Sequence, residues 1–132
     1  MTNNYRDTAF ELPGRDTAFE LPQRETAFEL MLDVVPDLRR LVDEVAKHDK
    51  DLARQIRRAA ESVVSNHGEA DGVQGGHRRE RVGTALGSAN ELLRQVQWAA
   101  AWGYTEPARA NRIITQVRRV CAMSYRRLHP RR

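Results

Sequence analysis

The apolar residues beyond about residue 26 recur every three or four positions in four separate stretches, and this spacing constrains the fold more than any other feature. Such spacing lines apolar side chains along one side of an α-helix. We expect helices over about residues 26–47, 50–66, 77–102 and 105–128. In chain order, the residues expected on the four apolar stripes are Phe28, Met31, Leu32, Val35, Leu38, Leu41, Val42 and Val45; Leu52, Ile56, Ala59, Ala60 and Val63; Val82, Leu86, Ala89, Leu93, Val96 and Ala100; and Ala110, Ile113, Ile114, Val117, Val120, Cys121, Ser124 and Leu128.

Glycine and proline set the expected limits of these helices. Pro36 should kink the first helix or mark a restart, and the composition of residues 67–76 predicts a loop. Gly103 should stop the third helix, and Thr105 followed by Glu106-Pro107 reads as the cap and first turn of the fourth, which Pro130 ends. Short connections force neighbouring helices to run antiparallel, so the sequence predicts an all-α, up-down-up-down four-helix bundle.

A nonapeptide occurs three times before the bundle. The copies are RDTAFELPG from Arg6, RDTAFELPQ from Arg15 and RETAFELML from Arg24. Proline ends the first two copies, whereas Met31 stands at that position in the third, which therefore continues into the first helix. We expect a flexible tail over residues 1–23, a bundle over 24–129 and a basic end over 130–132.

Two interpretations of the repeat remain open. One is an in-frame duplication that left a tail without a role. The other is a multivalent docking segment, in which linked apolar pairs bind a partner or a neighbouring subunit with raised avidity. The docking residues would be Phe10, Leu12, Phe19 and Leu21.

Charge is unevenly distributed along the chain. Residues 1–51 hold seven Lys/Arg and twelve Asp/Glu, a net charge of −5, and residues 52–132 hold fifteen Arg and six acids, a net charge of +9. The basic part could meet a polyanion, the acidic part, or both. A single cysteine, Cys121, excludes a disulfide within the chain, and no signal peptide or membrane span is evident, so we expect a cytoplasmic protein without membrane contact.

The second and third helices carry a more specific pattern. QIRRAAESVVSNHGEA from Gln55, ALGSANELLRQV from Ala85 and WAAAWGY ending at Tyr104 resemble the four-helix-bundle family encoded in intervening sequences of bacterial large-subunit ribosomal RNA. Over about residues 26–128 the chain follows that family, but His67-Gly68 replaces an apolar-Ala pair and Ala70 stands where glycine is expected. The residues on the family pattern include Gln55, Ser62, Asn66, Glu69, Gly87, Ser88, Glu91 and Tyr104.

The resemblance implies partners as well as a fold. Family proteins are thought to form ring-like homo-oligomers, often pentamers. Their relatives include accessory proteins of diversity-generating retroelements, which bind nucleic acid and a reverse transcriptase. RNA or DNA binding is thus an expectation for this chain.

Two groups of arginines are candidates for phosphate contact. Arginine donates hydrogen bonds in pairs to phosphate, with salt-dependent affinity. The alternative is that these arginines are solvated or pair with acids of the first helix. The candidates are Arg54, Arg57 and Arg58 in the second helix and Arg109, Arg112, Arg119 and Arg126 in the fourth.

The remaining polar residues suggest structure more than chemistry. Asn66 and Glu69 should tie the end of the second helix to the loop or to the third helix, and Gly87-Ser88 should allow close helix approach. No residue set has the spacing of a metal, cofactor or catalytic site, so no cofactor and no enzymatic activity are expected. The leading hypothesis is a non-enzymatic, homo-oligomeric, nucleic-acid-associated accessory protein, and the alternative is a protein-binding adaptor that uses the repeats.

Overall fold

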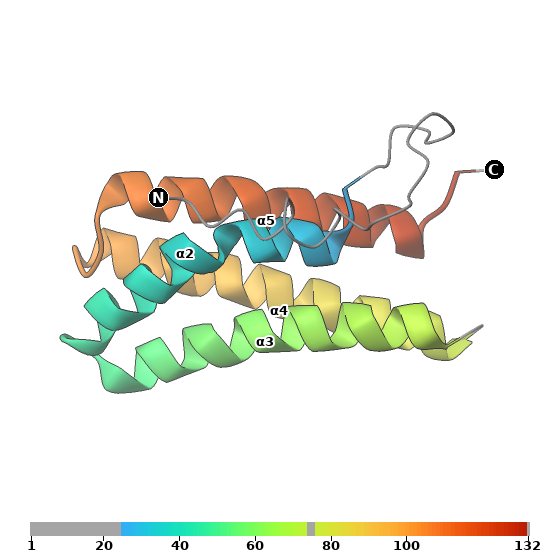
Figure 1. The fold of residues 1–132 in the computed structure, drawn as a ribbon, viewed down its shortest axis with the longest axis horizontal. Helices are drawn as coiled ribbons and strands as arrows, with labels where there is room; N and C mark the ends of the chain where they lie inside the picture. The colour runs from blue at the N-terminus through green and yellow to red at the C-terminus, as the bar shows by residue number, and fades with distance from the viewer. Residues whose placement is uncertain (1–24, 74–75, 132) are drawn as a thin grey trace, which may run out of the picture.

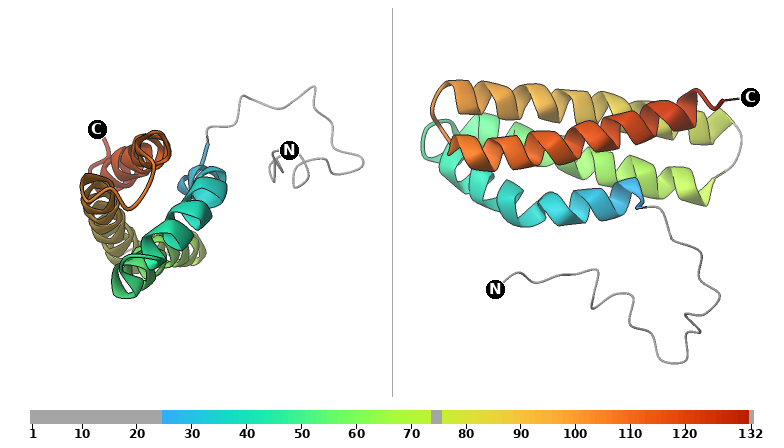
Figure 2. Two further views of the ribbon diagram at one scale, coloured as in Figure 1. Left: turned by 90° about the vertical axis from the view of Figure 1, so that its left-hand side faces the viewer. Right: turned by 90° about the horizontal axis from the view of Figure 1, so that it is seen from above.

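Four long helices make up the fold, which we describe from a computed structural model covering residues 25–73 and 76–131 (Figure 1). They are α2 (Ala27–Ala46), α3 (Lys50–Gly72), α4 (Gly76–Ala101) and α5 (Pro107–Leu128). Each helix packs on its neighbour in the chain, and α5 also packs on α2, so the four close into a bundle with consecutive helices antiparallel (Figures 1 and 2). The predicted all-α four-helix bundle is confirmed. The expected flexible tail lies outside the described residues.

Local signals explain most helix ends. The Thr26 hydroxyl accepts a 3.1 Å hydrogen bond from the amide of Glu29, and the Asp49 carboxylate accepts one of 2.9 Å from Leu52, so both side chains cap helix N-termini. At the end of α4, Gly103 has a φ of 75°, a left-handed conformation that favours glycine. The amide of Tyr104 reaches back to the carbonyl of Ala99 at 2.9 Å, which completes a Schellman motif.

Two expected features of the helix limits need correction. Helix α3 continues to Gly72, so residues 67–72, expected in a loop, are helical. The reason is that Ala70 is buried in the bundle and its packing outweighs the weak helix propensity of the glycines around it. The N-cap of α5 is Glu106 without a side-chain hydrogen bond, and Thr105 is buried and bonded elsewhere. The expectation for Pro36, a kink or a restart, is met in its first form: Pro36 lies inside a single helix, and α2 changes direction along its length (Figure 1).

The core follows the predicted stripes, with a rotation in α4. Ala85, Leu92 and Ala99 are buried there, whereas Leu86, Leu93 and Ala100 are half-buried at its edge. On α2, Phe28 and Val35 are exposed, although both were expected on the apolar stripe. The fully buried side chains of the four helices form one core, which includes Leu30, Leu41, Ile56, Val63, Leu92, Val96, Ile113 and Val117.

Candidate nucleic-acid interface

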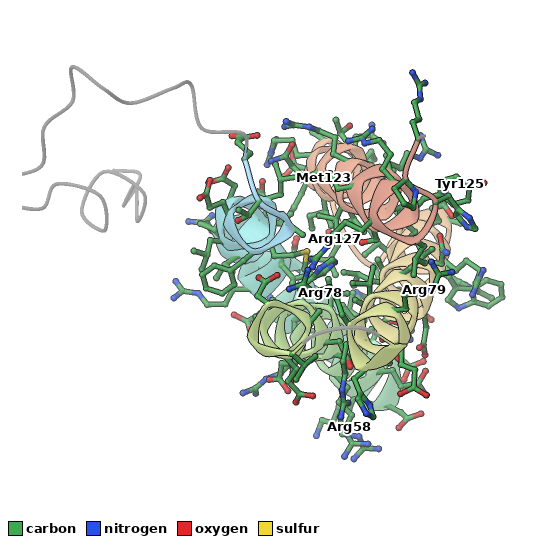
Figure 3. The ribbon with its side chains drawn as sticks, turned by 90° about the vertical axis from the view of Figure 1, so that its right-hand side faces the viewer. Arg58, Arg78, Arg79, Met123, Tyr125 and Arg127 are labelled. Atoms are coloured by element: carbon green, nitrogen blue, oxygen red, sulfur yellow. The ribbon has the colours of Figure 1, made fainter. Side chains whose placement is uncertain are left out.

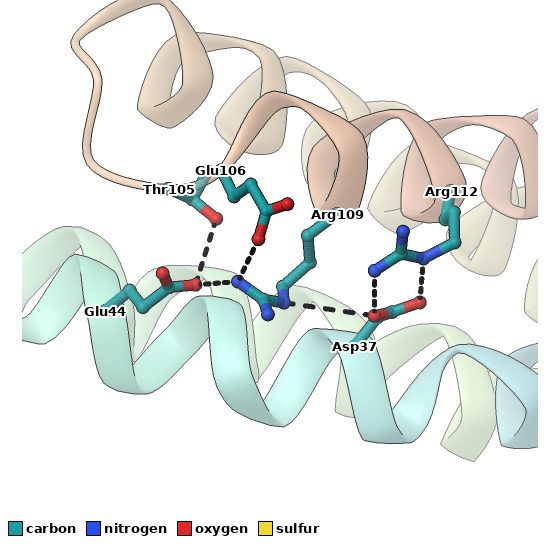
Figure 4. A network of polar contacts seen from close by, with 6 residues as sticks. All are labelled: Asp37, Glu44, Thr105, Glu106, Arg109 and Arg112. Atoms are coloured by element: carbon teal, nitrogen blue, oxygen red, sulfur yellow. Dashed lines mark hydrogen bonds and ion pairs between the residues drawn. The ribbon is translucent and has the colours of Figure 1, made fainter. Parts of the chain in front are cut away.

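Arg109 lies in the α2–α5 interface, where acidic side chains surround it (Figure 4). Its side chain is only 11% exposed and forms an ion pair with Glu44, with Glu106 and Asp37 at 3.7 and 3.9 Å. The hydroxyl of Thr105 donates to the same Glu44 carboxylate at 3.2 Å. These contacts favour the alternative interpretation for Arg109, pairing with acids of the first helix, and phosphate contact by this residue stays a prediction.

Two further arginines of α5 also pair with the beginning of the bundle. Arg112 donates two hydrogen bonds of 2.9 Å to the carboxylate of Asp37, and these bonds hold the pKa of that carboxyl below its usual value. Arg119 contacts the carboxylate of Glu25 at 2.7 Å. Arg112 therefore pairs with an acid of α2, as the alternative interpretation expected, and Arg119 pairs with an acid two residues before that helix.

The arginine cluster of α3 is exposed and only weakly engaged. Arg54 pairs with Asp51 and Arg57 with Glu61, one turn away on the same helix. Exposed pairs of this kind contribute about 0–1 kcal/mol, so a phosphate could replace either carboxylate. Within the described residues, Arg58 makes no ion pair. The α3 cluster remains a candidate for phosphate contact.

The two predicted arginine groups do not share a surface. Helix α3 packs on α2 and α4, and α5 packs on α4 and α2, so α3 and α5 lie diagonally across the bundle. Arg126, the remaining candidate of α5, is exposed near the end of that helix, far along the bundle from the α3 cluster.

A second concentration of arginine lies where α4 begins and α5 ends (Figure 3). Residues 76–84 and 118–131 hold eight arginines and one acid, Glu80. Arg81 and Arg127 pair with acids of α3, and Arg119 pairs with Glu25 just before α2. Within the described part of the chain, the other five have no carboxylate partner: Arg78, Arg79, Arg118, Arg126 and Arg131. We call four of these, Arg78, Arg79, Arg126 and Arg131, the basic end.

Two arginines of the basic end are fixed by backbone oxygens. Arg79 donates to the carbonyl of Leu128 at 2.8 Å, and Arg78 donates to the carbonyls of Ala70 and Val73 at 3.2 and 3.1 Å. A carbonyl orients a guanidinium without neutralising its charge, and a cation at the C-terminus of α5 also suits the helix dipole. These side chains are therefore ordered cations facing an open end of the bundle.

Of the basic end, only Arg126 was predicted, because the parts of this surface are far apart in the sequence. The signal was present as HRRER over residues 77–81 and as arginine pairs at 126–127 and 131–132. Antiparallel pairing of the third and fourth helices brings the start of one beside the end of the other. Combining the predicted topology with these runs would have found the surface.

Several residues of the family pattern connect α3 to α4. Ser62 and Ser88 share a hydrogen bond of 2.6 Å between their hydroxyls, and the Asn66 amide donates to the carbonyl and hydroxyl of Ser62. Glu69 pairs with Arg81 at 3.0 Å. These contacts fix the register of the two helices.

The other pattern residues have local contacts. Gln55 donates to Asp51 at 2.8 Å, and Glu91 accepts from Gln95 at 3.1 Å. Gly87 is exposed, and a Cβ there would meet nothing within 4 Å, so the expectation of close helix approach is wrong for this glycine within one chain.

His67, a departure from the family pattern, is buried and bonded across the bundle. Its Nε2 lies 2.8 Å from the hydroxyl of Ser124, and its Nδ1 lies 3.3 Å from Arg127. Burial is the main cause that lowers the pKa of His67, and the nearby charge of Arg127 acts in the same direction. Ser124 is fully buried, so this pair offers no nucleophile to a substrate.

Neither a metal site nor a bilayer-spanning helix is found in the described part of the chain. No group of three or more His, Cys, Asp or Glu side chains converges there. No helix within residues 25–73 and 76–131 combines the length and apolar character needed to cross a bilayer. Cys121 is half-buried, and burial raises the pKa of its thiol, which disfavours the reactive thiolate.

An apolar groove of about 650 Å³ lies between α2 and α3. Its lining includes the exposed Phe28 and Val35 together with Leu32, Val42 and Val64, and charged residues at the rim include Arg39 and Arg57. The proposed docking residues Phe10, Leu12, Phe19 and Leu21 lie outside the described residues.

Four aromatic rings form a ladder at the opposite end of the bundle from the basic end. Trp98 and Trp102, 58% and 60% exposed, meet edge to face with centroids 5.9 Å apart. Tyr104 stacks on Trp102 at 6.1 Å and on His48 at 4.7 Å. We call these four residues the aromatic ladder.

Comparisons with known proteins agree with this architecture. A search of curated proteins found no match. A crystal structure of a protein of unknown function from the S23 ribosomal protein family of Bacteroides thetaiotaomicron is similar in fold, with a TM-score of 0.72 and 16% identity. The similarity covers 79% of this chain and 99% of that one. The family model described as 23S rRNA-intervening sequence protein matches residues 21–126. The chain therefore belongs to the 23S rRNA-intervening sequence protein family.

Proposed function

We propose that this protein is a non-enzymatic, homo-oligomeric accessory protein that associates with RNA or DNA through its basic end. The observation that carries the proposal is the pair Arg78 and Arg79, whose guanidiniums are ordered by backbone carbonyls and keep their full charge. Phosphate contacts by such cations give affinity that depends on salt and not on sequence. The family that the chain resembles has relatives among the accessory proteins of diversity-generating retroelements, which bind nucleic acid, and this relation supports the same function.

Charge-neutralising variants test this proposal because the chain offers three matched pairs of arginines. Arg79→Gln with Arg126→Gln removes two charges from the basic end. Arg54→Gln with Arg57→Gln removes two from the α3 cluster, and Arg39→Gln with Arg40→Gln removes two from α2. Binding of the wild type and the three variants to labelled duplex DNA and structured RNA would be measured by fluorescence anisotropy from 50 to 300 mM salt.

We expect the basic-end variant to bind most weakly. The magnitude of its slope of log K against log salt should be smaller by about 1 to 2, because each lost phosphate contact reduces that magnitude by about 1. The α2 variant should bind like the wild type. Equal losses in all three variants would indicate a diffuse charge effect and no defined surface. Absence of binding by the wild type at low salt would overturn the proposal.

Homo-oligomerisation, as a pentamer by family resemblance, is part of the proposal. The aromatic ladder supports it, because a single chain leaves both indoles more than half exposed, and tryptophan is enriched in protein interfaces. Native mass spectrometry of the full chain gives the subunit number directly. A monomer at micromolar concentration would contradict this part of the proposal.

The groove between α2 and α3 favours a second candidate function, a protein-binding adaptor. The first two copies of the repeat, each with one phenylalanine and one leucine, match an apolar groove in chemistry, and they end at residue 23, just before the copy that runs into α2. Deletion of residues 1–23 should then change partner capture or assembly, whereas the nucleic-acid function predicts unchanged binding by the same variant. Identical partner capture and subunit number after the deletion would argue against the adaptor.

A further inference from the structure

Tyr125 and His129 form an aromatic pair at the end of α5. Tyr125 is 57% exposed, and the ring centroids lie 4.3 Å apart at an angle of 40°. The two residues are one helical turn apart, and the amide of His129 donates to the carbonyl of Tyr125 at 2.9 Å where the helix ends. The rings are therefore fixed to a rigid element while much of the tyrosine faces solvent.

Two arginines without a carboxylate partner among the described residues, Arg79 and Arg126, belong to the same end of the bundle as this aromatic pair. Arg79 reaches from α4 to the carbonyl of Leu128, the residue just before His129, and Arg126 follows Tyr125 directly. The described residues from 118 to 131 include five arginines and no Asp or Glu; Arg119 and Arg127 pair with acids elsewhere, which leaves Arg118, Arg126 and Arg131 without a carboxylate partner among the described residues. An aromatic face beside ordered cations provides both elements that bind a single strand, stacking for bases and charge for phosphates.

The aromatic ladder at the other end is larger but sits among different charges. Residues 43–54 and 98–109, which surround it, hold four Lys/Arg and five Asp/Glu. Such a nearly balanced set of charges does not attract a polyanion, but it is compatible with contact by another protein surface. Charge therefore assigns bases to the smaller pair and leaves the ladder to protein contact.

We propose that Tyr125 and His129 are a stacking platform for unpaired nucleobases, so that the basic end binds single-stranded nucleic acid in preference to a duplex. This inference rests on the proposed function and narrows its ligand to strands with accessible bases. Duplex bases are stacked on one another and offer the ring of Tyr125 no free face.

The test compares ligands and variants of the full chain. The ligands are labelled twelve-nucleotide oligo(U) and oligo(dT) and a twelve-base-pair duplex of mixed sequence. The variants are Tyr125→Ala, Tyr125→Phe and, as a control at the aromatic ladder, Trp98→Ala with Trp102→Ala. Circular dichroism melts and native mass spectrometry accompany each variant, so that changes in folding or subunit number are recognised.

Tyr125→Ala should weaken single-strand binding by about 5- to 100-fold, the range found for loss of one stacked base, and leave duplex binding unchanged. Its salt slope should stay that of the wild type because no charge is removed. Tyr125→Phe keeps the ring and should bind within about twofold of the wild type. Comparison of oligo(U) with oligo(dT) tells whether the ligand is RNA or DNA.

The failure modes are separable. If the wild type binds the duplex as well as the single strands, and Tyr125→Ala weakens neither, the stacking inference fails while the proposed function stands. If single-strand binding is lost in the tryptophan variant and kept in Tyr125→Ala, the bases stack at the ladder and the inference is wrong. If the wild type binds none of the ligands, the proposed function fails together with it.

Discussion

The imidazole of His67 donates a hydrogen bond to the hydroxyl of Ser124 across the diagonal of the bundle. The two atoms are 2.8 Å apart, and the serine hydroxyl in turn donates to the carbonyl of Val120, so its oxygen must accept from Nε2. The opposite ring nitrogen, Nδ1, then accepts from Arg127, which also pairs with Asp71. This arrangement requires a neutral imidazole.

The first prediction concerns pH. Because the pKa of His67 is lowered in the fold, the unfolded chain binds a proton more readily, and stability should fall as pH drops below about 6.5, the pKa of an unperturbed histidine. His67→Gln keeps a donor and an acceptor but cannot titrate. Urea unfolding at pH 7.5 and 5.5 should show a smaller loss for His67→Gln than for the wild type. An equal loss in both proteins would mean that other groups cause the acid sensitivity.

The second prediction concerns Arg109. Arg109→Ala leaves the Glu44 carboxylate without its arginine and Asp37 with one cation fewer. We therefore expect the free energy of unfolding to fall by about 1–3 kcal/mol. This loss is smaller than for a fully buried ion pair because Glu44 is partly exposed. Arg118→Ala removes an arginine from the same helix without breaking an ion pair among the described residues and should change stability by less than about 0.5 kcal/mol. Chemical denaturation measures both, and similar values for the two variants would contradict a structural role for Arg109.

Arg109 and Arg126 show why a sequence alone could not tell an ion-paired arginine from an exposed one. The sequence offered both interpretations of Arg109 and Arg126, phosphate contact and pairing with the first helix, because both lie on polar positions of α5. Choosing between them requires the rotation of α5 against α2, which periodicity leaves undetermined. Gly103 was predicted correctly as a helix stop because its signal is local. Ala70 was placed in a loop because surrounding glycines have weak helix propensity, and only packing across the bundle reveals that it is buried.

The third prediction uses the helical extension of α3. Gly68 is exposed inside the helix, and a Cβ there would meet nothing within 4 Å. Gly68→Ala should therefore stabilise the fold by about 0.5–1 kcal/mol, as expected for glycine replaced in a helix interior. Ala70→Gly, two residues away, should destabilise it by about 1 kcal/mol or more because a buried methyl group is also lost.

Thermal or urea unfolding of the two α3 variants distinguishes a helix from a loop over residues 67–72. In a loop, neither substitution would change helix propensity, and the pair would not move in opposite directions. Destabilisation by Gly68→Ala would show that the backbone there is not helical in solution.

The fourth prediction concerns Gln95, a residue of α4 whose side chain is buried. Its Nε2 donates to Glu91, but Oε1 has no hydrogen-bond partner among the described residues. An unmet buried acceptor costs about 1–3 kcal/mol, and methionine fills a similar volume without one, so Gln95→Met should stabilise the protein by about 1 kcal/mol. Gln95→Glu places a charge at the same position, beside Glu91, and should destabilise it. If Gln95→Met is instead destabilising, Oε1 has a hydrogen-bond partner in solution. The aromatic ladder begins one turn away at Trp98, so this partner could belong to a second subunit. Native mass spectrometry of the variant would test this, because the loss of such a contact should change the subunit number.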